Sequence, residues 1–133
     1  MQVSEYKVSL IGKKNIGKTC FLKRLNNTFS EDSNYIPTLG VSVSPIDILG
    51  SNGKIRLNVW DIAGDERFRG LKSDYHINSN LAVIFKNDNN DHLLFENELP
   101  NNIKKIYINN YNYINPELTI DQYKLLLYEN ILN

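Results

Sequence analysis

Runs rich in apolar residues along the chain have the length of buried β-strands. The run at 6–11 predicts a buried strand that leads into a tight turn, and the runs at 81–85 and 103–108 predict strands that are covered on both faces by helices. Two further segments, 41–49 and 54–60, are rich in β-forming residues and flank the turn-forming sequence Gly50-Ser51-Asn52-Gly53. Because glycine and asparagine favour tight turns, these two segments predict an antiparallel hairpin.

Two other segments carry apolar residues at the spacing of an α-helix. The apolar residues of the first are Phe21, Leu22 and Leu25, and those of the second are Ile120, Tyr123, Leu127 and Ile131. The first helix is expected to begin at Lys18 and to end at Asn26 and Asn27, and Thr119 precedes the second as an N-cap. Helices that alternate with strands predict an α/β fold, with a mixed, mostly parallel sheet and helices on both faces.

A phosphate-binding pattern lies between the first apolar run and the first helix. Residues 12–19, Gly-Lys-Lys-Asn-Ile-Gly-Lys-Thr, match G-x-x-x-x-G-K-[ST] in full. Gly12 and Gly17 permit backbone N–H groups to point at phosphate oxygens, and Lys18 would supply a charge to the terminal phosphates of a nucleotide. The alternative is a glycine-rich turn before an ordinary helix. The residues expected to line this P-loop are Gly12, Lys14, Asn15, Ile16, Gly17, Lys18, Thr19 and Cys20.

A carboxylate follows the second strand of the predicted hairpin and completes a candidate magnesium site. Asp61 comes directly after the strand, where it would lie beside the P-loop and hold Mg²⁺ through water, while the Thr19 hydroxyl would be a direct ligand. Gly64 would leave its backbone N–H free for a γ-phosphate. Without the P-loop upstream, Asp61 would be interpreted as an ordinary loop carboxylate.

Length and charge narrow the class of protein. A chain of 133 residues fits a single domain, which we place over residues 1–133. Its 15 basic and 15 acidic residues cancel, so no electrostatic field favours a nucleic acid or an anionic membrane. Cys20 is the single cysteine, which excludes an internal disulfide, and no apolar run reaches the roughly 20 residues needed to cross a bilayer. We expect an intracellular protein, cytoplasmic or nuclear, without a membrane anchor.

Three further segments lie around these motifs: residues 35–40, Tyr-Ile-Pro-Thr-Leu-Gly, residues 61–64, Asp-Ile-Ala-Gly, and residues 66–68, Glu-Arg-Phe. They resemble the switch regions of Ras-superfamily GTPases. The flanking segments 41–45, 57–60 and 70–72 are most similar to the Ran family, with the Rab family next. The resemblance implies a Ras-like GTPase fold that binds GTP or GDP with Mg²⁺. It also implies that Thr38 is a second Mg²⁺ ligand with an N–H for the γ-phosphate, and that Tyr35 closes over the phosphates.

Two departures from the Ras-like pattern bear on hydrolysis. Asp65 stands where the family has the glutamine that orients the attacking water, and a carboxylate adds negative charge beside a phosphate. We therefore expect weak or absent GTP hydrolysis, although Asp65 acting as a general base is an alternative. Lys14 stands where a small residue is common and would obstruct an arginine finger, or reach the phosphates itself, or remain a solvated lysine.

Two further departures affect the base pocket and the end of the chain. The guanine-reading motif N-K-x-D aligns with Asn110-Tyr111-Asn112-Tyr113, so that Asn110 is retained while tyrosines replace the lysine and the aspartate. Tyr111 is interpreted either as a platform that stacks on a base or as a packing residue. The final strand and helix of the Ras-like fold are expected to be missing, and the exposed sheet edge suggests a homodimer.

These motifs support two functional hypotheses. The first is a Ran-like GTP-binding switch that turns over slowly. The second is a non-hydrolysing pseudo-GTPase that acts as an interaction module or decoy for Ran or Rab effectors, regulators or transport receptors. The chain has no basic patch or stacking motif for nucleic acid, which ranks below both.

Overall fold

The computed structural model describes residues 3–12, 16–26, 41–62, 78–90, 92–96, 99, 102–109, 111 and 116–132. The described elements, in chain order, are β1 (Ser4–Ile11), α1 (Lys18–Leu25), β2 (Val41–Gly50), β3 (Gly53–Ile62), β4 (Leu81–Lys86), α3 (His92–Glu96), β5 (Lys105–Asn109) and α4 (Ile120–Leu132). No helix in the described part of the chain is long and apolar enough to cross a membrane.

The five described strands form one mixed sheet in the order β2-β3-β1-β4-β5. β2 and β3 pair antiparallel around the predicted turn, with Gly50 opposite Gly53. The β1–β3, β1–β4 and β4–β5 pairs are all parallel. The carboxyl ends of four strands therefore meet at one edge of the sheet, where open α/β sheets place their ligands.

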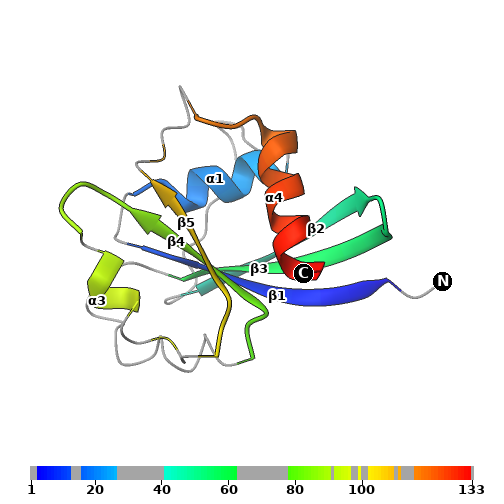
Figure 1. Ribbon diagram of the computed structural model, residues 1–133, viewed down its shortest axis with the longest axis horizontal. Helices are drawn as coiled ribbons and strands as arrows, with labels where there is room; N and C mark the ends of the chain where they lie inside the picture. Colours follow the sequence, from blue (N-terminus) through cyan, green and yellow to red (C-terminus); the bar gives the residue numbers. More distant parts are fainter. Residues whose placement is uncertain are drawn as a thin grey trace.

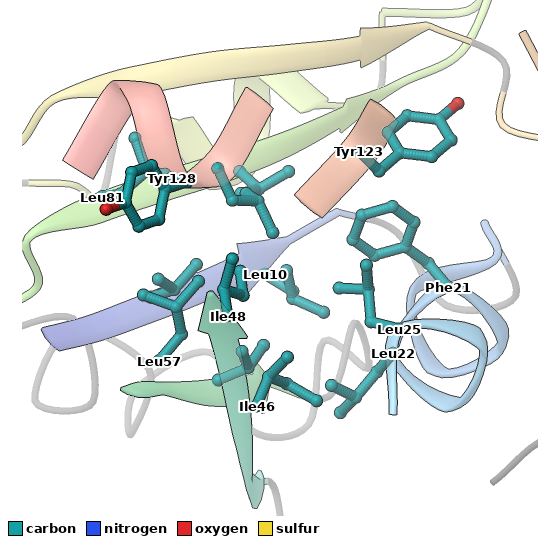
Figure 2. Packing of buried hydrophobic residues seen from close by; sticks show 14 of the residues in the cluster. Leu10, Phe21, Leu22, Leu25, Ile46, Ile48, Leu57, Leu81, Tyr123 and Tyr128 are labelled. Atoms are coloured by element: carbon teal, nitrogen blue, oxygen red, sulfur yellow. The ribbon is translucent and has the colours of Figure 1, made fainter. Parts of the chain in front are cut away.

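Helices cover both faces of this sheet, as the apolar runs at 81–85 and 103–108 predicted. α1 and α4 lie on one face and α3 lies on the other (Figure 1). Side chains alternate accordingly along β4: Leu81, Val83 and Phe85 pack into the core beneath α1 and α4, whereas Ala82 and Ile84 pack into a smaller core on the opposite face. Figure 2 shows the larger core, with the apolar residues of α1 facing those of the strands and of α4.

Both long helices begin where the sequence indicated. Gly17 precedes α1 with φ of +108°, a left-handed conformation that a side chain would strain. At the start of α4 the Gln122 amide donates to the Thr119 hydroxyl over 3.1 Å, and the Thr119 amide donates to the Gln122 side chain over 2.8 Å. This reciprocal pair is a capping box, in which two otherwise unpaired backbone donors are satisfied.

Two elements, β5 and α3, differ from the sequence prediction. The apolar run 103–108 predicted a strand from Ile103, but β5 begins at Lys105, and Ile103 is buried in the smaller core together with Leu99. α3 was not predicted, because a helix of five residues is too short to display an apolar stripe.

The hairpin turn is joined to α4 by Tyr128. Its Oη accepts a hydrogen bond from the Asn52 amide over 2.9 Å and donates to the Gly53 carbonyl over 3.0 Å. A Cβ at Gly50 would lie only 2.2 Å from the Tyr128 ring, so glycine is required there for close approach. α4 is thereby fixed against the β2–β3 hairpin as well as against α1.

We expect Tyr128→Phe to lower the free energy of unfolding by about 1–2 kcal/mol, because both hydrogen bonds to the turn are lost while the ring still packs. Urea unfolding followed by circular dichroism measures this difference. Leu125→Ala is the control on the same helix, since Leu125 is exposed and its truncation should change stability little. Equal unfolding midpoints for Tyr128→Phe and the unsubstituted chain would contradict the prediction.

Candidate functional site

The predicted nucleotide- and metal-binding residues that the structure describes lie at the carboxyl edge of the sheet. β1 ends at Ile11 and leads through Gly12 toward α1, while Asp61 lies near the end of the neighbouring strand β3. The predicted site residues that the structure describes are Gly12, Ile16, Gly17, Lys18, Thr19, Cys20 and Asp61. Those outside the described residues are Lys14, Asn15, Tyr35, Thr38, Gly64, Asp65 and Asn110.

Lys18 is held inside the phosphate-binding segment rather than in solvent. Its Nζ donates to the Gly12 carbonyl over 2.5 Å, and the residue is only 6% exposed. The first turn of α1 is closed by the Phe21 amide, which donates to the Gly17 carbonyl over 2.9 Å. A cation and the positive end of a helix thus lie together, which is the electrostatic requirement of a phosphate site.

Thr19 and Asp61 are in direct contact. The Thr19 hydroxyl donates to Asp61 Oδ2 over 2.6 Å, so its proton faces the carboxylate and its lone pairs remain available to a cation. Burial raises the pKa of Asp61, while the bond from Thr19 and the charge of Lys18 oppose that rise. Mg²⁺ is commonly bound by one or two protein oxygens together with substrate phosphates, and this hydroxyl–carboxylate pair fits that donor set.

A comparison with protein-family models agrees with this geometry. The model for the Roc domain, described as "Ras of Complex, Roc, domain of DAPkinase", matches residues 7–115. The chain belongs to the Roc family. Roc is a Ras-superfamily GTPase domain, so the predicted Ras-like, GTP-binding fold is confirmed at that level. Among the described residues, the sheet of this Roc domain has one antiparallel pair, β2–β3, and its other pairs are parallel, which is consistent with a P-loop GTPase fold.

An aromatic cluster of four residues lies beside the candidate phosphate site of the Roc domain. Its members are Phe21 of α1, Phe85 of β4, Tyr111 after β5 and Tyr123 of α4. Their rings meet edge to face: Tyr111 lies 5.3 Å from Phe21, 6.1 Å from Phe85 and 5.9 Å from Tyr123 between centroids. Figure 2 shows Tyr123 facing Phe21 across the gap between the two helices.

The cluster also contacts both glycines of the motif. A Cβ at Gly12 would lie 3.1 Å from Phe85 Cβ, and one at Gly17 would lie 3.0 Å from Tyr111 Cδ1. Of the two sequence interpretations of Tyr111, packing is the one that these contacts match. Sequence reasoning missed Phe85 and Tyr123, which read as ordinary core positions because their contacts with the site are tertiary.

Burial raises the pKa of Tyr111 to about 12. Ionisation above pH 10 is therefore easier in the unfolded chain than in the native domain. The protonated tyrosine contributes stability that is fully present below pH 10 and is lost as the pH rises through about 12. We expect Tyr111→Phe to move alkaline unfolding to higher pH and to remove a component near pH 12 from the tyrosinate absorbance titration. An unchanged titration in this variant would contradict the assignment.

Proposed function

We propose that this Roc domain is a slow guanine-nucleotide switch that loads GTP or GDP together with Mg²⁺. The observation that carries the proposal is the joint placement of Lys18 at the Gly12 carbonyl and of Thr19 on Asp61. The first pair supplies a charge for the phosphates, and the second supplies a hydroxyl ligand for the metal and a carboxylate that holds it through water. Both pairs come from residues that the sequence motifs had already selected.

The remaining roles in the proposal come from the Ras-like switch sequences. Thr38 is assigned a second Mg²⁺ oxygen and an N–H for the γ-phosphate, Gly64 another N–H, and Tyr35 closure over the phosphates. Loss of the γ-phosphate would release these contacts, which is how nucleotide state becomes conformational state. Asn110 is assigned to the base side of the site, since it follows β5 two strands away from the P-loop.

Slow turnover is attributed to Asp65 and Lys14. A carboxylate at position 65 places a negative charge near the attacking water, and a long side chain at position 14 narrows access for an arginine finger. If Asp65 limits the reaction, Asp65→Gln raises single-turnover GTP hydrolysis while leaving GTP affinity unchanged. A general-base role for Asp65 has the opposite signature, because Asp65→Gln would then reduce the rate further.

A second candidate function is an interaction module that has lost its chemistry. Its support is the pair of tyrosines, Tyr111 and Tyr113, in the guanine-reading motif together with Asp65. In this proposal the Ran-like switch sequence engages Ran or Rab effectors, regulators or transport receptors in the cytoplasm or nucleus. Receptor binding that survives Lys18→Ala favours the module, and binding that requires loaded nucleotide favours the switch.

The outer edge of β5 bears on whether the protein is a monomer or a homodimer. β5 hydrogen-bonds to β4 on one side, and no strand among the described residues pairs with its other side. Lys104 and Lys105 lie at the start of this edge, and charges of that kind discourage edge pairing. Sedimentation equilibrium gives the molecular mass in solution and decides between monomer and dimer.

Nucleotide retention is the direct test of the proposed function. The purified protein is denatured, any released nucleotide is identified by chromatography, and the nucleotide-free protein is titrated with GTP, GDP and ATP in Mg²⁺ by calorimetry. Guanine-selective binding supports the switch. Absence of binding to all three overturns it and leaves the interaction module.

A further inference from the structure

The two glycines of the phosphate motif are both in contact with the aromatic cluster, although the members of that cluster lie far apart in the sequence. Phe85 is the neighbour of Gly12, and Tyr111 is the neighbour of Gly17. Phe85 is fully buried, so its position is determined by the core, whereas Tyr111 follows the end of β5 and is half-buried. Tyr111 is therefore the member whose replacement changes the contact with the loop without opening the centre of the core.

Contact between Tyr111 and Gly17 is close on the ring and on the backbone. A Cβ at Gly17 would meet Tyr111 Cδ1 at 3.0 Å, the Tyr111 carbonyl oxygen at 3.7 Å and Cε1 at 3.8 Å. Gly17 has φ of +108° and is the residue from which α1 begins. The tyrosine ring thus lies directly over the backbone position that orients Lys18 and Thr19.

The ring itself has little freedom to move away. It meets Phe21 at an interplanar angle of 88° and Phe85 at 86°, and Tyr123 of α4 closes a third side at 72°. Such edge-to-face contacts prefer defined ring orientations. Three elements therefore hold the ring that lies next to Gly17.

The hydroxyl of Tyr111 does not carry this role. Its Oη is buried and makes no hydrogen bond to any described residue. The atoms of the ring, not the hydroxyl, are the side-chain atoms of Tyr111 that lie nearest to Gly17. That division allows the role to be tested by a phenylalanine, which keeps the ring and removes the hydroxyl.

We propose that Tyr111 is a positioning residue that sets Gly17, and through it Lys18 and Thr19, for phosphate binding. The inference rests on the proposed nucleotide site. It assigns Tyr111 an effect on the phosphate end of the ligand, whereas a base-reading tyrosine would affect only the nucleoside end. A ligand that has phosphates but no base separates the two roles.

The test compares Tyr111→Phe, Tyr111→Leu and Leu127→Ala in the full chain. Leu127 is a buried residue of α4 and is not among the nearest neighbours of Gly12 or Gly17. Its truncation therefore controls for a general loss of stability. The ligands are GTP and inorganic tripolyphosphate, each with Mg²⁺. The second readout is hydrogen exchange of the Phe21 amide in nucleotide-free protein, because that amide donates to the Gly17 carbonyl.

We expect Tyr111→Leu to lose about 10- to 100-fold in affinity for both ligands by the same factor, the range typical of residues that support a ligand shell. In Tyr111→Leu, hydrogen exchange of the Phe21 amide should become faster than the loss of global stability alone would make it. Tyr111→Phe and Leu127→Ala should both retain affinity for the two ligands. In each of them, any faster hydrogen exchange of the Phe21 amide should be accounted for by the change in that variant's global stability.

Three results would overturn the inference: a loss confined to GTP, equal losses in Tyr111→Leu and Leu127→Ala, or unchanged Phe21 protection in Tyr111→Leu. If the unsubstituted chain binds neither ligand, the proposed function fails. Phe21 protection then still decides whether Tyr111 positions Gly17.

Discussion

Replacing Lys18 by methionine is expected to weaken GTP binding by roughly two orders of magnitude, which corresponds to about 3 kcal/mol for a lost charge-assisted hydrogen bond. Lys18 is buried and already aligned by its bond to the Gly12 carbonyl, so its ammonium needs little rearrangement to reach a phosphate. Methionine has a similar length and keeps the packing of the stem while removing the charge. Calorimetry with GTP and with tripolyphosphate measures the loss.

The matched control is Lys54→Met, which makes the same change of net charge on the hairpin. Lys54 pairs with Asp47 at 3.4 Å and its side chain is 51% exposed, so an effect there would be general rather than local. We expect Lys54→Met to bind GTP like the unsubstituted chain. Unchanged binding by Lys18→Met would place the phosphates elsewhere and would remove the basis of the proposed site.

The strands were predictable because a strand that is buried on both faces has apolar residues at consecutive positions of the sequence. β4 reads as five consecutive apolar residues, and the hairpin is marked by the glycines that flank its turn. The order of the strands in the sheet was not predictable, since the apolar pattern of β1 does not indicate that β3 and β4 are its two neighbours. The starting point of β5 failed for a related reason: Ile103 is apolar because it packs in the smaller core, not because it belongs to a strand.

The candidate site was predictable to the extent that its chemistry lies in local motifs. Lys18 and Thr19 are marked by the glycine spacing, and Asp61 by its place at the end of a strand. The support of the site was not predictable, because Phe85 and Tyr111 reach the glycines only after β4 and β5 have paired. Of the two interpretations of Tyr111 in the sequence, a base platform and a packing residue, its contacts with Phe21 and Gly17 match packing.

Asp61→Asn is expected to abolish most of the Mg²⁺ dependence of GTP binding. Asparagine has nearly the same shape and still offers an oxygen to the Thr19 hydroxyl, so the local hydrogen bond is retained while the negative charge is lost. In Mg²⁺ the affinity of the variant should fall by about 10- to 100-fold, and in EDTA it should match that of the unsubstituted chain. Lys18→Met differs, because it lowers affinity under both conditions.

Stability should respond in a different way from binding. Asp61 is 6% exposed and burial raises its pKa, which means that the native domain disfavours the charged form. Asparagine removes that desolvation cost, so the nucleotide-free variant should unfold at the same temperature as the unsubstituted chain or at a higher one. Asp47→Asn is the control for removal of a carboxylate charge, because Asp47 pairs with Arg56 on the surface of the β2–β3 hairpin. A normal Mg²⁺ response in Asp61→Asn would show that the carboxylate does not hold the metal.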